Sequence, residues 1–196
     1  MDLSEYYGKT VPDLLPDGPL RLLFVGINPG LWTAKTQAHF ARRGNRFYPA
    51  LYRAGLTAYP IDASGGYAEA DRRELTSRGI GISNLVPHAT ARADELTRAE
   101  VRGGEQRLSR LVAQRAPKVV AVLGITSFRT AFARPKAVEG WQDSPWPATR
   151  LFVTGNPSGL NAHATVDSLA AAFRDVALAA GIDVDSAQRK CGDGVS

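Results

Sequence analysis

The sequence of 196 residues contains one cysteine, three histidines and no long apolar run, and each shortage excludes a class of protein. Cys191 stands alone in a polar stretch, so we expect neither an internal disulfide nor a thiolate metal cluster. His39, His88 and His163 are too widely scattered to show the spacing of metal ligands. We therefore expect no metal site, and no other feature of the sequence implies an organic cofactor.

Membrane and secretion signals are also missing. No apolar run approaches the roughly 20 residues of a membrane-spanning helix. The N-terminus lacks the basic and apolar regions of a signal peptide. We expect a soluble cytoplasmic protein with no membrane partner. With 44% hydrophobic residues, the chain is long enough for one well-buried core and short for two, so we expect a single domain and a monomer.

Acidic residues are missing from two stretches of a chain whose formal net charge is +5. Residues 18–61 contain no Asp or Glu but include six Lys and Arg residues, and residues 144–166 again contain no carboxylate. Surfaces without carboxylates can approach a polyanion such as nucleic acid. An ordinary solvated basic face is the alternative interpretation. Charge alone thus favours nucleic acid without establishing it.

Four apolar runs alternate with helical patterns along the chain, which predicts an α/β fold. Continuous apolar runs bounded by turn residues are typical of parallel strands covered on both faces. The expected architecture is a three-layer α/β/α sandwich around a central four-stranded, mainly parallel sheet. The predicted strands are 22–25, 80–86, 119–123 and 151–154, and the predicted helices are 45–54, 67–77, 97–115, 125–133 and 165–181.

The chain divides into three parts on this interpretation. Residues 1–19 carry prolines and a glycine among polar residues and predict an irregular lead-in with one helical turn. The domain spans residues 20–181. Residues 182–196 are polar and unpatterned, and we expect a disordered tail.

Two turn segments, 26–30 and 156–160, each follow a predicted strand. Their sequences, Gly-Ile-Asn-Pro-Gly and Asn-Pro-Ser-Gly-Leu, combine the residues that shape tight turns. Loops at the carboxyl ends of parallel strands line the ligand crevice of an open α/β sheet. Both segments should therefore border one site. Neither has the spacing of a serine nucleophile elbow, a phosphate-binding loop or a dinucleotide fingerprint.

These motifs, with Phe40 and the Asn-Arg-Phe-Tyr segment 45–48, resemble the mismatch-specific uracil-DNA glycosylase and thymine-DNA glycosylase family, a branch of the uracil-DNA glycosylase superfamily. The resemblance covers roughly residues 20–181. Other branches usually have Asp or a different flanking pattern in the first motif and His-Pro-Ser in the second. Such enzymes flip a mismatched or damaged base out of double-stranded DNA and hydrolyse its N-glycosidic bond with water, leaving an abasic site. The resemblance implies excision of uracil from G·U mismatches, no cofactor, and association with the bacterial nucleoid through DNA.

The resemblance also assigns roles to residues of the first motif. The Asn that matches Asn28 positions the attacking water, and Phe40 aligns with the aromatic residue that stacks on the flipped base. An amide does not titrate near neutral pH, so Asn28 orients water without taking its proton, and backbone N–H groups around Ile27 and Phe40 can stabilise the departing base. The alternatives are a structural turn for Asn28 and a core position for Phe40. The expected substrate-binding residues are Gly26, Ile27, Pro29, Gly30, Phe40 and Asn45.

The second motif matches the loop that enters the duplex. Leu160 matches its tip and is expected to be an exposed wedge, although a leucine more often belongs to a core. Two residues beyond this leucine a bacterial member of the family carries an Arg, whereas this chain has Ala162 followed by His163. The expected DNA-binding residues are Lys35, Arg42, Arg43, Asn156, Pro157, Ser158, Gly159, Leu160, Asn161 and His163.

Asp94 is a second catalytic candidate, outside both motifs. It lies in the loop after the second predicted strand and can act as a general base or stabilise the cation-like sugar. The alternative is a surface or helix-capping carboxylate close to Thr97. For the whole protein, the alternative functions are a catalytically weak binder of mismatched or abasic DNA and a hydrolase of free nucleosides. Asn28 argues against the binder, and Leu160 with the carboxylate-free loops argues against the nucleoside hydrolase.

Overall fold

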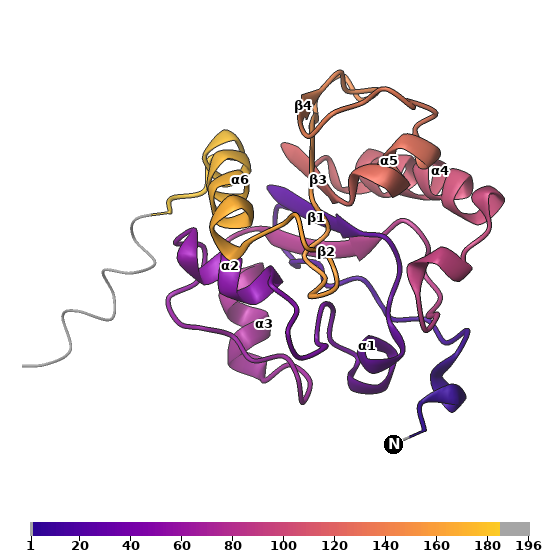
Figure 1. Ribbon diagram of the computed structural model, residues 1–196. Helices are drawn as coiled ribbons and strands as arrows, with labels where there is room; N and C mark the ends of the chain where they lie inside the picture. The colour runs from indigo at the N-terminus through magenta and orange to yellow at the C-terminus, as the bar shows by residue number, and fades with distance from the viewer. Residues whose placement is uncertain (1, 185–196) are drawn as a thin grey trace, which may run out of the picture.

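The centre of the protein is a five-stranded sheet with the order β2-β1-β3-β5-β4 (Figure 1). The computed structural model describes residues 2–184. Four strands are parallel and coincide with the predicted ones: β1 (Leu22–Gly26), β2 (Ile80–Asn84), β3 (Val119–Leu123) and β5 (Arg150–Thr154).

The expectation of four strands was wrong by one edge strand. Strand β4 (Gly140–Gln142) pairs antiparallel with β5 and places Trp141 opposite Phe152. It is only three residues long and none of its residues is buried. A segment so short and exposed produces no hydrophobic pattern, so the sequence gives no indication of it.

Helices cover both faces of the sheet, which confirms the three-layer α/β/α sandwich (Figure 1). Alternate residues of β1 point to opposite faces, so Phe24 belongs to one core cluster and Val25 to the other. One face packs against α2 (Phe47–Arg53), α3 (Glu69–Thr76) and α6 (Val166–Ala179), and the other against α4 (Arg98–Arg115) and α5 (Ile125–Ala131).

The two long helices begin where their capping residues predict. The Thr97 hydroxyl accepts a hydrogen bond from the backbone N–H of Glu100, and the Thr165 hydroxyl accepts one from Ser168. These bonds satisfy N–H groups that have no partner within the helix. Helix α1 (Leu31–Thr36) was not predicted; it begins directly after the first turn segment.

The N-terminal residues are more integrated than an irregular lead-in suggests. A 3₁₀ turn, η1 (Ser4–Tyr6), is the expected helical turn. Val11 and Leu14 are buried, and Leu14 exchanges backbone hydrogen bonds with Ile82 of β2. The lead-in therefore extends the core beside β2.

The disordered tail expected over residues 182–196 is wrong at its start. Ile182 is 5% exposed and Val184 is 2% exposed, and both belong to the core cluster below α2 and α6. The carbonyl of Val184 also lies where a side chain at Gly55 would stand, 2.2 Å from an ideal Cβ. Two apolar residues spaced by one were too weak a pattern to distinguish from a tail. The rest of that stretch, including Cys191, lies outside the described residues. Within residues 2–184, no helix is both long and apolar enough to cross a membrane.

Candidate functional site

The loops that follow the four parallel strands enclose one cavity of about 890 Å³. Its lining comes from the turn after β1, the loop after β2, the start of α5 after β3, and the segment after β5. The two turn segments therefore border the same cavity, as their positions at strand ends predict.

Asn28 is held in the cavity wall with its amide nitrogen turned toward the protein. Its Nδ2 donates to the Thr90 hydroxyl at 2.7 Å, and lies 3.2 Å from the carbonyl oxygen of Pro29 and 3.3 Å from that of His88. The Thr90 hydroxyl donates in turn to the carbonyl oxygen of Arg92 at 2.7 Å, so it accepts from Asn28. Carbonyl oxygens accept only, which fixes the amide orientation. Asn28 Oδ1 is left without a partner among the described residues and can accept a hydrogen bond from water.

Phe40 forms another wall of the cavity and is backed by the core. Its ring stacks on buried Phe47, with centroids 4.3 Å apart. Its backbone has φ 55°, a left-handed conformation that bulky residues rarely adopt. The preceding residue, His39, anchors this turn, because its carbonyl oxygen accepts from the Tyr48 hydroxyl at 2.7 Å and its N–H donates to the Tyr67 hydroxyl at 3.2 Å. The strained turn is thereby held by buried hydrogen bonds.

Gly26 leaves room for two side chains over the end of β1. An ideal Cβ at this position would lie 2.6 Å from Asn84 Oδ1 and 3.1 Å from Phe40 Cζ. A side chain here would therefore displace both the aromatic wall and the buried amide. Gly26 contributes to the predicted substrate site through this close approach.

The second turn segment forms a compact loop with an exposed apolar tip. Leu160 is 79% exposed, which fits the predicted wedge. Asn156 Oδ1 accepts from the N–H of Ser158 at 2.9 Å, and Asn161 Nδ2 donates to the carbonyl oxygen of Asn156 at 2.9 Å. Both amides thus shape the loop that presents Leu160.

Arg46 ties this wedge loop to the loop that carries Phe40. Its Nη1 donates to the carbonyl oxygens of Ser158, at 2.9 Å, and Asn161, at 2.8 Å, and its N–H donates to that of Pro157 at 2.9 Å. An ideal Cβ on Gly159 would lie 2.7 Å from the carbonyl oxygen of Gly44. The two loops approach so closely that only glycine fits at this contact.

Asp94 lines the cavity at its exposed side, in the 3₁₀ turn η2 (Ala93–Glu95). Arg92 binds both of its oxygens, with Nε 3.0 Å from Oδ1 and Nη2 2.5 Å from Oδ2. The Asp94 side chain is 63% exposed. Glu139, from the segment before β4, also lines the cavity. The turn segments lack acidic residues, but the cavity that they border has two.

Most of the predicted site residues line this cavity. Lys35, Arg43, Pro157 and Gly159 are not among its lining residues, and Gly26 acts from behind it. Lys35 lies over the Trp32 ring, with Nζ 5.1 Å from the centroid. The predicted residues that line the cavity are Ile27, Asn28, Pro29, Gly30, Phe40, Arg42, Asn45, Asp94, Asn156, Ser158, Leu160, Asn161 and His163.

Several polar residues of the site were missed from the sequence. Asn84, which is 5% exposed, ends β2 and faces the cavity, and a polar residue at the carboxyl end of a predicted strand is a usable sign of a site. Thr90, Arg46, His39 and Glu139 carry no such sign, because only tertiary contacts bring them to the site.

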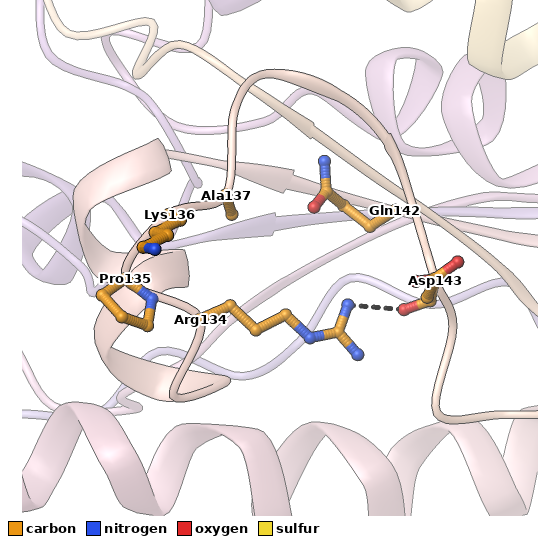
Figure 2. Close-up of a pocket in the computed structure, with 6 residues that line it drawn as sticks. All are labelled: Arg134, Pro135, Lys136, Ala137, Gln142 and Asp143. Carbon is orange, nitrogen blue, oxygen red and sulfur yellow. Dashed lines mark hydrogen bonds between the residues drawn. The ribbon is translucent and has the colours of Figure 1, made fainter.

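A second hollow, of about 420 Å³, lies between the end of α5 and β4. Figure 2 shows Arg134 reaching across it to donate to the carbonyl oxygen of Asp143, at 2.6 Å. None of the predicted site residues lines it. Its walls have no aromatic side chain, so the cavity at the carboxyl ends of the strands is the candidate site.

The candidate site combines an aromatic wall, which suits a planar group, with a free amide oxygen on Asn28 that can accept a hydrogen bond from water. No cluster of three or more His, Cys, Asp or Glu within residues 2–184 has the geometry to hold a metal ion. In a comparison with protein families, the model of the uracil DNA glycosylase superfamily matches residues 12–177.

Proposed function

This chain belongs to the uracil DNA glycosylase superfamily, which indicates a DNA glycosylase, and we propose that it excises uracil from G·U mismatched duplex DNA. The observation that carries the proposal is the fixed amide of Asn28 beside the aromatic wall of Phe40 in one cavity. Together they provide a place for a water molecule and a place for a flipped base.

Phe40 and Asn84 bind the base in the proposed reaction. A flipped uracil stacks on Phe40, an interaction typically worth about 1 to 3 kcal/mol per base. Its polar edge faces the buried amide of Asn84, which is next to Phe40 over Gly26. The flipped base would displace water from the space beside Phe40 and Asn84, and hydrogen bonds to its developing negative charge are stronger there than in bulk water.

Asn28 positions the attacking water in the proposed reaction. Its free Oδ1 accepts one hydrogen of a water and directs the oxygen toward C1′ of the deoxyribose. The C1′–N1 bond breaks, uracil leaves with the bonding electrons, and the water oxygen bonds to C1′. We assign Asp94 as the acceptor of the proton that this water loses. One Asp94 oxygen then exchanges its hydrogen bond from Arg92 for one from the water, and Arg92 stays protonated. No lysine lines the described cavity, which supports water rather than an amine as the nucleophile.

The wedge loop, around Leu160, contacts the DNA duplex in the proposed reaction. Leu160 enters the stack as the base leaves it, offsetting part of an unstacking cost of a few kcal/mol. Arg42 and His163 at the cavity rim and Arg43 beside it are assigned to backbone phosphates. We propose that the base left opposite is guanine and that it lies against the loop around Gly159 and Asn161.

The deciding experiment compares labelled duplexes containing G·U or A·U with single-stranded DNA containing U, followed by alkali cleavage of abasic sites. We expect cleavage with the wild-type protein, fastest on G·U, and at least about 100-fold slower cleavage with Asn28→Ala. Tight binding without any cleavage would favour a mismatch-binding protein instead. Undiminished activity of Asn28→Ala would contradict the assigned water site.

A further inference from the structure

His39 and Asn84 form a buried pair behind the candidate base pocket. His39 is 2% exposed and Asn84 is 5% exposed. The Nδ1 of His39 lies 3.2 Å from Nδ2 of Asn84, and its Nε2 lies 2.9 Å from the carbonyl oxygen of Pro12. The imidazole therefore joins the N-terminal segment to the end of β2. His39 is the residue directly before Phe40 in the sequence.

The partners of His39 determine where its proton lies. The carbonyl oxygen of Pro12 can only accept, so Nε2 carries the hydrogen. In the neutral ring the other nitrogen is then an acceptor, and Nδ1 takes a hydrogen bond from the amide nitrogen of Asn84. Burial lowers the pKa of His39 below its usual value, which keeps the ring neutral around pH 7.

Charged groups on three sides of His39 act in opposite directions. Asp13, in the N-terminal segment, raises the His39 pKa, whereas Arg107 of α4 and Arg72 of α3 lower it. Arg107 is itself bound to Asp13, with Nη2 3.0 Å from Oδ2, and the two groups shift the His39 pKa in opposite directions. Burial remains the largest cause, and the neutral ring follows from the packing.

The neutral ring fixes which atoms Asn84 presents to the cavity. With Nδ2 bound to His39, Oδ1 faces the space over Gly26 next to the Phe40 ring. This oxygen has no hydrogen-bond partner among the described residues. Among the same residues, Thr57 Oγ1 is the only fully buried side-chain polar atom without a partner, so Asn84 Oδ1 is not fully buried. Asn84 Oδ1 is therefore reached from the cavity as a free acceptor, beside the second N–H of the same amide.

This edge of the Asn84 amide, an acceptor beside a donor, is complementary to uracil and not to cytosine. Uracil offers an N3–H donor beside the O4 acceptor, whereas cytosine offers an N3 acceptor beside an amino donor. We propose that His39 is a specificity-determining positioning residue, whose Nε2–H tautomer holds the acceptor of Asn84 toward the flipped base and thereby rejects cytosine. The inference rests on the proposed function, because it requires a flipped base next to Phe40.

The first test reads the tautomer directly. Long-range ¹H–¹⁵N correlation spectra of the full chain at about pH 7 resolve the three histidines, and a His39→Asn spectrum assigns the one that disappears. We expect His39 as the neutral Nε2–H form. A protonated ring, or a proton on Nδ1, would overturn the inference whether or not the protein is active.

The second test measures discrimination with two variants. In His39→Asn, the amide oxygen takes the place of Nδ1 and keeps the acceptor, whereas in His39→Gln the amide reaches the Nε2 position and leaves Nδ1 empty. Duplexes carry 5-fluorouracil or 5-fluorocytosine opposite guanine, because fluorine activates both bases as leaving groups, and the intrinsic difference between them cancels when the rate ratios of two proteins are compared. Single-turnover excision gives the ratio of the two rates for each protein, and circular dichroism checks folding.

We expect His39→Gln to lower the fluorouracil-to-fluorocytosine ratio by about tenfold or more, since a freed Asn84 can turn its amide to either base. His39→Asn should keep a ratio close to wild type. Loss of packing alone would slow both bases equally and leave the ratio unchanged, and that outcome in a folded His39→Gln protein would overturn the inference. Absence of fluorouracil excision by the wild-type protein would instead contradict the proposed function, and the spectra would still test the tautomer.

Discussion

The guanidinium of Arg46 donates to the carbonyl oxygen of Ser158 at 2.9 Å, joining the loop that carries the base pocket to the loop that carries the wedge. The two residues are 112 positions apart in the sequence. Because the same Nη1 also binds the carbonyl oxygen of Asn161 at 2.8 Å, one side chain fixes both ends of the turn around Leu160.

Replacing Arg46 by Met should loosen this connection while keeping most of its apolar stem. We expect single-turnover excision from a G·U duplex to fall by about tenfold, with less effect on single-stranded DNA, where no wedge is needed. Arg73→Met is a matched control, because Arg73 lines a hollow at the opposite ends of the strands. Equal losses on both substrates would show that Arg46 acts on folding or on the pocket instead.

Thr90 should matter to excision through Asn28. Thr90→Val keeps the shape of the side chain but removes the hydroxyl that accepts from Asn28 Nδ2 at 2.7 Å. The amide then keeps only its longer contacts, 3.2 Å to the carbonyl oxygen of Pro29 and 3.3 Å to that of His88, and is held less firmly. We expect excision to slow by about 10- to 100-fold without a change in duplex affinity. Thr90→Ser retains the hydroxyl and should stay near wild type. If the Val variant excises at the wild-type rate, Thr90 does not orient Asn28.

Leu160 should distinguish duplex from single-stranded substrates. Its side chain is 79% exposed, so Leu160→Ala removes little packing energy from the free protein and should leave its melting temperature unchanged. We expect excision from a G·U duplex to fall by about tenfold, because unstacking is no longer offset. Excision from single-stranded DNA serves as the internal reference, and a parallel loss there would contradict the wedge role.

Asp94→Ala tests whether this carboxylate takes part in chemistry. A general base usually contributes about 10²- to 10⁴-fold, so we expect excision to slow at least tenfold while DNA affinity is maintained. Arg92→Met is the informative companion, since it frees both Asp94 oxygens from their ion pair. Unchanged excision by Asp94→Ala would remove Asp94 from the mechanism and leave Asn28 with the water alone.

Acid should destabilise the protein through His39. Burial lowers the pKa of His39 in the folded state, so the unfolded chain binds a proton first as the pH falls below about 6.5. The free energy of unfolding then decreases toward the folded pKa, by at most about 1.4 kcal/mol per pH unit. Denaturant melts at several pH values should show a smaller loss of stability just below about pH 6.5 for His39→Asn than for the wild type, because the variant lacks this group.

The fold followed from local patterns that the sequence displays. Continuous apolar runs marked all four parallel strands, and Thr97 and Thr165 marked the starts of the long helices. Strand β4 and helix α1 were missed because three or six residues beside irregular loops produce no clear period. Ile182 and Val184 were misassigned because their burial depends on a distant surface under α2 and α6.

The site was predictable only where a motif carried it. Asn28, Phe40 and Leu160 were identified from short segments, and the structure places them around one cavity. Arg46 entered the sequence prediction only as part of a motif, although its hydrogen bonds connect the loop that carries Phe40 to the wedge loop. Such roles depend on contacts between residues more than 100 positions apart, which no local pattern encodes.

The connection through Arg46, with the close contact of Gly159 and Gly44, sets a fixed span between the wedge and the base pocket. On the proposed function, we expect a bound duplex to deform until the flipped base and the wedge residue fit this fixed span. Sites that deform easily meet the span at low cost, whereas stiff, well-stacked sites do not. We therefore expect recognition on the proposed function to depend on how easily the duplex deforms, in addition to the chemical identity of the base.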